Sequence, residues 1–318
     1  MTNNDENVSV IICVYTMERL EDIHEAVDSV LAQTLKPHEV IVAVDHNEEL
    51  LDRLKSELPP RVKLVLSNGA PGLSDTRNAG ISSSTGEIVA FIDDDAMAVE
   101  TWLENLIPSF EDSKVMAVGG QAIPLWSKGK PPFWFPEEFD FIIGCTAHKK
   151  LILQENSEVR NVTGSNMAFR KEIFQKVGFW ETKLGRCELG RVRFNPTGGE
   201  EAELCLRIKT AIPDGVILFR PESVVHHKVI PERATLKYVF NFCFREGITR
   251  AMMRKLVSRY VQNPLAAENL FLRRLLSTSL LQRLRNFYKP SSLAQVAMIM
   301  ANLFLMGTGY LLGRWRYR

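Results

Sequence analysis

Closely spaced cysteines are absent from this 318-residue chain. No CxxC pair or Cys/His cluster occurs, so a structural zinc site is not expected. An odd number of scattered cysteines predicts reduced thiols in a cytoplasm rather than disulfides. The five cysteines are Cys13, Cys145, Cys187, Cys205 and Cys243.

A secretory signal is also missing, because residues 1–10 are polar and acidic, without a basic start and an apolar run. The 19 glycines and 15 prolines follow no period, which excludes collagen-like and low-complexity classes. With 45% hydrophobic and 24% charged residues, the composition is that of a globular protein with one large or two smaller domains.

Acidic residues are scarce in the last quarter of the chain. From Lys237 to Arg318 there are 14 Lys and Arg but two acids, Glu246 and Glu268, a net charge of +12. Because the whole chain carries +1, residues 1–236 carry −11. So basic a segment favours contact with anionic lipid or with nucleic acid.

Short apolar strands alternate with amphipathic helices in the first third of the chain, which predicts an α/β fold. The sheet should be mostly parallel with helices on both faces. Ligands of such sheets bind at the carboxyl ends of the strands, where Asp45 and the run Asp93–Asp95 fall. Either alone could be a solvated loop acid; together they indicate a site. The expected strands are 8–15, 39–44, 62–66 and 87–92, and the expected helices 20–33, 50–58, 73–82 and 102–110.

Three regions follow or interrupt the predicted α/β domain, which we place at residues 1–236. Residues 120–150 form an aromatic, proline-containing insert, either core packed under a long loop or a lid over substrate. Residues 237–289 are a basic amphipathic helical region. Residues 290–318 form a hydrophobic helix, in which residues 293–313 carry no charge and could cross about 30 Å of hydrocarbon. We expect it to be membrane-associated or transmembrane; a buried terminal helix is the alternative.

Two acidic motifs could carry chemistry. Asp93 and Asp95 flank Asp94, so both could face one hard cation on a diphosphate. Glu200 and Glu201 follow two glycines, where a carboxylate could accept a proton from a hydroxyl nucleophile. The alternative is that these acids only favour the start of a helix through its dipole.

Two basic motifs accompany them. Arg77 lies between Gly72 and Gly80, where it could contact a phosphate or hold the acidic strand ends together. His226 and His227 lie in a strand-like run and face opposite sides. One of them could ligate a metal beside carboxylates; ordinary packing is the alternative.

The order of these motifs resembles the inverting family 2 glycosyltransferases of GT-A fold, over roughly residues 7–230. The insert around Trp134, Gly144-Cys-Thr, Val159-Arg-Asn and Arg245-Glu-Gly resemble more narrowly the archaeal glucosyl-dolichyl phosphate glucuronosyltransferases. The matching motifs are Asp45, Gly72-Leu-Ser, Arg77-Asn-x-Gly80, Asp93-Asp-Asp95, Gly164-Ser-Asn-Met-Ala-Phe-Arg170, Gly199-Glu-Glu, Leu-x-x-Arg207 and a later histidine.

The resemblance implies a Rossmann-like nucleotide-diphospho-sugar transferase fold and a role for each matched residue. Asp95, with Asp93 and either His226 or His227, would ligate Mn²⁺ or Mg²⁺. Glu201 would take the place of the catalytic base, commonly Asp in the family, with Glu200 as the alternative. Val14, Tyr15, Asp45, Arg77, Asp93 and Asp94 would bind the donor nucleotide, with Asp45 on a base such as uracil, and Gly164, Ser165 and Asn166 would line the donor or acceptor sugar.

The sequence thus predicts a metal-dependent inverting glycosyltransferase. Its donor would be a nucleotide sugar, with UDP as the expected nucleotide and glucuronic acid a candidate sugar, and its acceptor a lipid-linked sugar on polyprenyl or dolichyl phosphate. We expect the cytoplasmic face of the cell membrane. A soluble polysaccharide or protein acceptor is the alternative. A nucleic-acid-binding protein that uses the basic C-terminal region is the remote alternative. Nucleic acid is not an expected partner, because the basic residues alternate with Leu rather than with exposed aromatic side chains.

Overall fold

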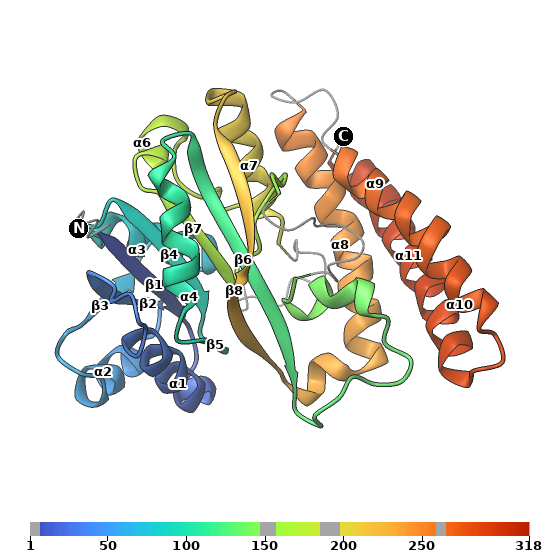
Figure 1. Cartoon of the computed structure of the whole chain (residues 1–318), viewed down its shortest axis with the longest axis horizontal. Helices are drawn as coiled ribbons and strands as arrows, with labels where there is room; N and C mark the ends of the chain where they lie inside the picture. Colours follow the sequence, from blue (N-terminus) through green and yellow to red (C-terminus); the bar gives the residue numbers. More distant parts are fainter. Residues whose placement is uncertain (1–6, 147–156, 185–197, 259–264, 318) are drawn as a thin grey trace. The chain divides into compact units, whose positions relative to one another are not determined.

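The computed structural model describes residues 7–146, 157–184, 198–258 and 265–317. Residues 147–150 of the aromatic insert and Cys187 therefore lie outside the described part. The chain divides into two compact units (Figure 1). Unit 1 comprises Met1–Ile123, Glu155–Arg191 and Glu200–His227, and unit 2 comprises Pro124–Gln154, Val192–Gly199 and Lys228–Arg318.

The first half of the sheet confirms the predicted parallel arrangement. The strands β1 (Val8–Val14), β2 (Glu39–Asp45), β3 (Val62–Ser67) and β4 (Ile88–Asp93) pair in parallel in the order β3-β2-β1-β4. Each observed strand starts and ends within a residue of its predicted range. Their β-branched residues and the helices between them make this the expected pairing.

The second half of the sheet is mixed. Antiparallel pairing joins β7 (Asn166–Arg170) to β4 and to β6 (Val115–Trp126), and joins β5 (Ala96–Ala98) to β8 (Val216–Val229). The complete order is β3-β2-β1-β4-β7-β6-β8-β5. After residue 110 the sequence shows no regular alternation of strand and helix. Two strands that pair in parallel need a crossover connection between them, usually a helix. The antiparallel half therefore had no local signal.

Helices cover both faces of the sheet, as predicted. One apolar cluster joins α1 (Leu20–Leu31), α2 (Glu48–Glu57) and α4 (Trp102–Leu106) to one set of alternating strand residues. A second cluster joins α3 (Leu73–Ser83), α6 (Ile173–Val177) and α7 (Glu200–Ala211) to the other set. A Cβ on Gly80 would lie 2.6 Å from Ile11 Cγ2, so α3 approaches the sheet closely because of this glycine.

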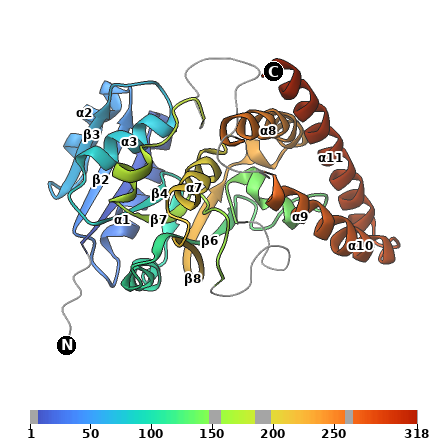
Figure 2. The same ribbon diagram turned by 90° about the horizontal axis from the view of Figure 1, so that it is seen from above.

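Unit 2 contains a helical core built with the aromatic insert. The side chains of Phe135, Phe139, Phe242, Leu275 and Ile299 are buried in one cluster, so packing accounts for much of the insert. Helix α11 runs alongside α8 (Figures 1 and 2). The remaining elements are η1 (Met17–Arg19), η2 (Ile107–Glu111), η3 (Glu137–Ile143), η4 (Pro231–Ala234), α8 (Leu236–Val257), α9 (Ala266–Arg274), the π-helix η5 (Leu275–Leu280), α10 (Leu281–Arg285) and α11 (Pro290–Arg316).

Candidate active site

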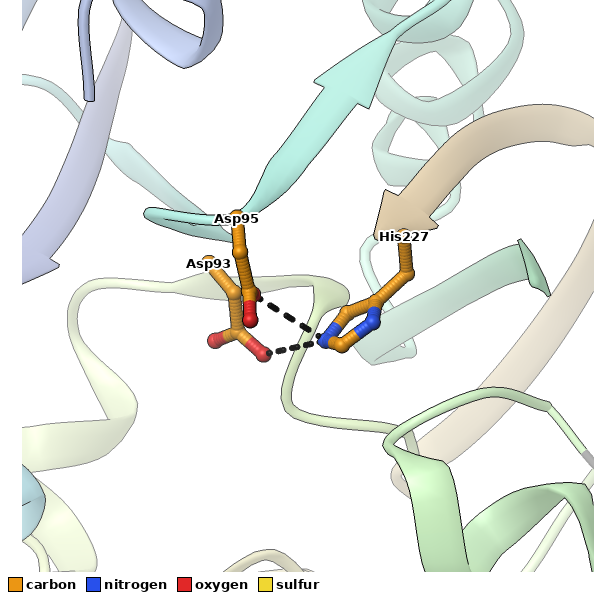
Figure 3. Close-up of side chains that lie close together, drawn as sticks. All are labelled: Asp93, Asp95 and His227. Atoms are coloured by element: carbon orange, nitrogen blue, oxygen red, sulfur yellow. Dashed lines mark ion pairs between the residues drawn. The ribbon is translucent and has the colours of Figure 1, made fainter. Parts of the chain in front are cut away.

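Two carboxylates and one imidazole meet beyond the carboxyl end of β4 (Figure 3). His227 Nε2 lies 3.2 Å from Asp95 Oδ1 and 3.5 Å from Asp93 Oδ2. The three ligand atoms lie within 4.8 Å of one another. Asp95 and His227 are buried, whereas Asp93 is partly exposed. Two oxygen donors and one nitrogen donor suit Mn²⁺, or Mg²⁺ with added oxygen ligands, so these residues fit a divalent cation.

Strand pairing selects one of the two histidines. In the β5–β8 ladder Ala96 is opposite His227 and Met97 is opposite His226. Asp95 immediately precedes Ala96, so this register brings the His227 ring to the acidic turn. Side chains alternate along a strand, so His226 points to the other face. The structure therefore joins His227, and not His226, to Asp93 and Asp95.

Arg19, which the motifs did not reveal, neutralises part of this acidic turn. Its Nη1 lies 2.6 Å from Asp94 Oδ1 and 3.2 Å from Asp95 Oδ2, and its guanidinium lies over the Tyr15 ring. Burial raises the pKa of Asp94 to about 7, against the opposing effect of Arg19. Asp94 is thus buried against an arginine, and its contact with the donor nucleotide stays a prediction. The sequence offered only one indication of Arg19, namely a basic residue shortly after the first strand.

Asp45 ends β2 and is fixed by its own loop. Its carboxylate accepts the Gly72 N–H at 3.1 Å and lies 2.7 Å from His46 Nδ1. His46 has a positive φ of 49°, which is uncommon for a residue with a side chain. The Asp45 hydrogen bond raises the pKa of His46. The predicted nucleotide-binding carboxylate is therefore held in one orientation at the end of its strand.

Arg77 faces two carboxylates. Its Nη1 lies 3.2 Å from Glu200 Oε1 and 3.3 Å from Glu201 Oε1, and its guanidinium stacks on the Trp180 ring with 4.9 Å to the ring centroid. Arg77 thus pairs with the acids at the start of α7 rather than with the acidic strand ends, and its contact with a phosphate stays a prediction. Trp180 had no signal in the sequence.

Glu200 and Glu201 have different surroundings. The Glu200 side chain is 3% exposed, and its Oε2 has no partner among the described residues, whereas Glu201 is 17% exposed. Burial and the Glu200 carboxylate raise the pKa of Glu201 to about 7, against the opposing effect of Arg77. Glu201 is therefore the one of the pair that combines solvent access with a pKa suited to proton transfer near neutrality.

Gly164 lies against Glu201 and Arg77. A Cβ at Gly164 would lie 2.3 Å from Glu201 Oε1 and 2.6 Å from Arg77 Nη2, so any other residue here would have to displace these two side-chain ends. Ser165 next to it is buried. The absence of a side chain at Gly164 thus leaves space for the Glu201 carboxylate.

Asn166 and Val14 are both buried. Asn166 is fully buried, accepts a hydrogen bond from Trp102 Nε1 at 2.8 Å, and donates to the carbonyls of Gln121 and Ser223. Val14 is buried in the core. The Asn166 amide thus joins neighbouring strands of the sheet, and the Val14 side chain packs inward. Their roles at the sugar and at the nucleotide stay predictions.

Cys13, on β1, is affected by the charges of several of these residues. It is opposite Asp93 in the β1–β4 ladder. Burial raises the pKa of Cys13 to about 12, with smaller electrostatic effects from Arg77, Asp93, Asp94 and Asp45. The Asp93 charge also raises the pKa of Glu201. The Asp93 charge acts on both Arg77 and Glu201, so it links the acidic turn to the Arg77–Glu201 pair.

Comparison with known proteins identifies the family. Residues 9–178 match the sequence profile described as Glycosyl transferase family 2. The chain is also 35% identical, over 96% of its own length and 96% of the relative, to the glucosyl-dolichyl phosphate glucuronosyltransferase of Haloferax volcanii. The chain is a family 2 glycosyltransferase. A second relative, succinoglycan biosynthesis protein ExoM of Rhizobium meliloti, is 25% identical over 80% of this chain and 77% of that protein.

Solved structures support the GT-A fold of this glycosyltransferase. The mannosyltransferase PcManGT of Pyrobaculum calidifontis, in complex with GDP-Man and Mn²⁺, aligns with a TM-score of 0.59 at 15% identity, over 97% of this chain and 88% of that one. GalNAc-T7 with UDP, GalNAc and Mn²⁺ aligns with a TM-score of 0.52 at 17% identity. It covers 80% of this chain, which spans about half (52%) of GalNAc-T7.

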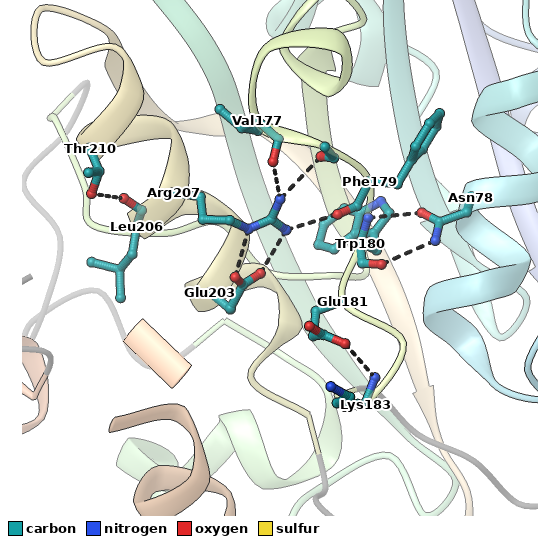
Figure 4. A network of polar contacts seen from close by, with 11 residues as sticks. Asn78, Val177, Phe179, Trp180, Glu181, Lys183, Glu203, Leu206, Arg207 and Thr210 are labelled. Atoms are coloured by element: carbon teal, nitrogen blue, oxygen red, sulfur yellow. Dashed lines mark hydrogen bonds and ion pairs between the residues drawn. The ribbon is translucent and has the colours of Figure 1, made fainter. Parts of the chain in front are cut away.

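In the glycosyltransferase, a polar network fixes the loop that carries Trp180 (Figure 4). Asn78 on α3 donates to the Trp180 carbonyl and accepts the Trp180 N–H. Arg207 on α7 forms an ion pair with Glu203 and donates to the carbonyls of Val177 and Phe179. Two helices therefore hold the aromatic ring on which Arg77 rests. Asn78 and Arg207 belong to motifs of the sequence, but no local pattern indicates that both bind the loop at residues 177–180.

Proposed function

We propose that this glycosyltransferase moves a sugar from a nucleoside-diphosphate donor to a hydroxyl of a lipid-linked sugar, with inversion at the anomeric carbon. The observation that carries the proposal is that the cluster Asp93, Asp95 and His227 and the Arg77–Glu201 ion pair lie in the same unit, where the Asp93 charge also raises the pKa of Glu201. A divalent cation held by Asp93, Asp95 and His227 would stabilise the negative charge of the departing diphosphate.

The residues of the chain supply the proton chemistry. Glu201 Oε accepts the proton of the acceptor hydroxyl as that oxygen forms a bond to the anomeric carbon and the bond to the diphosphate oxygen breaks. Arg77 stabilises the ionised carboxylate between proton transfers. Asp45, fixed by Gly72 and His46, orients the nucleotide base at the end of β2. One displacement of this kind inverts the configuration.

The lipid-linked acceptor is proposed from the Haloferax relative and the charge of the chain. That relative is named a glucosyl-dolichyl phosphate glucuronosyltransferase. UDP-glucuronic acid and a glucosylated polyprenyl phosphate are accordingly the first donor and acceptor to test. The net charge of +12 beyond residue 236 suits an anionic cytoplasmic leaflet, and α11 is long and apolar enough to associate with a membrane.

Product analysis tests this proposal. The full chain is incubated with Mn²⁺, a panel of nucleotide sugars, and either glucosyl polyprenyl phosphate or a soluble glucoside. The proposal expects transfer to the lipid-linked acceptor, and an inverted anomeric coupling constant of the new linkage by NMR. Transfer to the soluble glucoside alone would exclude the lipid acceptor, and retained configuration would exclude single displacement.

A chelator and one isosteric variant test the cation. We expect excess EDTA to abolish transfer and added Mn²⁺ to restore it. Asp95→Asn should lose transfer and also the rise in melting temperature that Mn²⁺ plus nucleotide diphosphate gives the parent, because a carboxylate ligand becomes a neutral amide. His226→Ala is the matched control and should keep both properties. Full activity in EDTA would exclude a cation at Asp93, Asp95 and His227.

A further inference from the structure

Exposed hydrophobic side chains are concentrated at the end of the chain. Within the described residues, 12 of the 16 large hydrophobic side chains that are exposed lie between Leu270 and Trp315. A soluble protein scatters such residues, and a concentration of them indicates a surface that another phase or molecule covers.

The outward face of α11 is apolar along most of its length. Exposed positions recur every three or four residues and hold no charged or polar side chain before Arg314. Helices that face water place polar residues on that face instead. The exposed positions are Leu293, Ala297, Met300, Phe304, Gly307, Leu311 and Trp315, and we call them the outer stripe.

The opposite face of α11 is closely packed against α8. A Cβ on Gly309 would lie 1.9 Å from Phe244 O, and a Cβ on Gly313 would lie 2.7 Å from Ala251 Cβ. On α8, a Cβ on Gly247 would lie 2.1 Å from Met306 O. The backbones of the two helices therefore touch, which only glycines allow.

The first half of α11 is attached to the aromatic insert. Met298 and Ile299 are buried in the core of unit 2. Gln295 donates to the carbonyl of Phe133 at 3.1 Å and accepts from Arg283, which pairs with Glu138 at 2.6 Å. One face of α11 is thus covered along the whole helix, by the aromatic insert in its first half and by α8 in its second half. The outer stripe on the other face is exposed.

This attachment is incompatible with α11 crossing a bilayer by itself. Arg254 on α8 donates to Tyr310 Oη at 2.6 Å, and Arg250 forms ion pairs with Glu246 and Glu268. If α11 crossed the hydrocarbon, its partner α8 would bring these charged groups with it. Charged groups inside the hydrocarbon are strongly unfavourable.

We propose that unit 2 binds the surface of an anionic membrane with α11 lying in the plane of the interface and the outer stripe in contact with the acyl chains. Leu281, Leu284 and Phe287 extend the exposed apolar surface beside α11. Exposed basic residues supply charge complementarity to anionic headgroups: Arg273, Arg274, Arg285, Lys289, Arg314 and Arg316. This attachment does not depend on which sugar or acceptor the active site takes.

Vesicle flotation tests whether the outer stripe binds an anionic membrane. The purified full chain is mixed with vesicles of phosphatidylcholine alone or with added phosphatidylglycerol. We expect flotation with the anionic vesicles, and a bound fraction lowered about tenfold or more by Phe304→Ser with Leu311→Ser. The control is Leu125→Ser with Leu236→Ser, two leucines outside α11 that are 45% and 46% exposed, and this variant should float like the parent. Unchanged near-ultraviolet circular dichroism shows that each variant is folded.

Two outcomes of flotation would overturn the proposal. One is equal flotation of the outer-stripe variant and the parent. The other is absence of flotation together with a dimer in light scattering that the outer-stripe variant dissociates, since the stripe would then bind a second copy. Neither outcome depends on glycosyltransferase activity, which is assayed separately in detergent.

Thiol labelling distinguishes an in-plane helix from a spanning one. Single Ser291→Cys and Arg316→Cys variants lie near the two ends of α11. In sealed membrane vesicles, an impermeant maleimide should label both from the same side, with the unsubstituted chain as background. Labelling of the two positions from opposite sides would show that α11 spans the membrane and would overturn the proposal.

Discussion

At the scale of single residues, Arg77 is the positive charge that faces the two carboxylates of the candidate base site. One guanidinium faces both Glu200 and Glu201, so one carboxylate charge is left over in a buried site. Two close carboxylates resist ionising together, so the Glu200 charge raises the pKa of Glu201. A proton is therefore held near Glu201 at a pH where an isolated glutamate would be fully ionised.

Substitution of each glutamate separates their roles. Glu201→Gln keeps the shape of the side chain but cannot accept a proton, and we expect about a 10²–10⁴-fold loss of kcat. Donor affinity, measured by calorimetry, should stay near the parent value because the base acts on the acceptor. Glu200→Gln should cost less, because its carboxylate is enclosed behind Arg77. A more severe defect in Glu200→Gln would move the base by one residue.

The pH dependence follows from the same carboxylate. Burial and Glu200 raise the pKa of Glu201 to about 7. Below that pH Glu201 is protonated and cannot act as a base, so kcat/KM should fall as the pH falls through about 7 and level off above it. In Glu201→Gln this acidic limb should disappear from the residual activity. A parent limb near pH 4 to 5 would indicate an unperturbed carboxylate instead.

The residues of the site differ in how far the sequence revealed them. Asp45, Asp93 and Asp95 were predictable because each follows an apolar strand, and strand ends share an edge of the sheet. The choice of His227 over His226 depends on the register of β5 against β8, which no local pattern encodes. Arg19 and Trp180 were missed because their partners lie far along the chain: Arg19 pairs with Asp94, and Trp180 supports Arg77.

At the scale of elements, close contact between α8 and α11 depends on glycines rather than on side-chain volume. Small residues at such contacts let backbones approach, as in membrane helices. The glycines on α11 differ sharply in their surroundings. A Cβ on Gly309 would lie 1.9 Å from a backbone oxygen, whereas a Cβ on Gly307 would meet nothing within 4 Å. This difference provides a matched pair of substitutions on one helix.

We expect Gly309→Ala to destabilise unit 2 and Gly307→Ala to stabilise it. The added methyl at Gly309 must separate the two helices, at a cost of about 1–3 kcal/mol. At Gly307 the same methyl only restricts the unfolded chain, which contributes about 0.5–1 kcal/mol in favour of the helix. Thermal unfolding in detergent measures both changes. Equal melting temperatures for the two variants would contradict the observed α8–α11 contact.

Element boundaries show what local patterns can and cannot predict. Strands β1 to β4 and helices α1 to α3 were predictable because apolar periodicity and turn residues define them locally. The predicted helix at 102–110 ends at Leu106 and continues as the 3₁₀-helix η2 because of Pro108. The antiparallel strands β6 and β7 had no such signal, since their partners are set by the closure of the sheet.

At the scale of the whole molecule, charge is divided along the chain. The first 236 residues carry −11 and the remainder carries +12. Exposed basic groups act on anionic lipid within about a Debye length, about 10 Å at 0.1 M salt. Salt should therefore weaken binding to anionic vesicles without affecting the apolar contact of the outer stripe. This separates the electrostatic from the hydrophobic part of membrane attachment.

Deletion of residues 290–318 should release the chain from membranes, but it should also unfold unit 2. Helix α11 contributes Met298 and Ile299 to the core and covers α8 at Gly247, so its loss exposes an apolar surface. We expect the truncated chain to lose the calorimetric transition of unit 2 and to aggregate. By contrast, Phe304→Ser with Leu311→Ser changes side chains of the outer stripe, so it should release the chain while that transition remains. A truncated chain that keeps a cooperative transition for unit 2 would mean that α11 is an independent anchor and not part of its core.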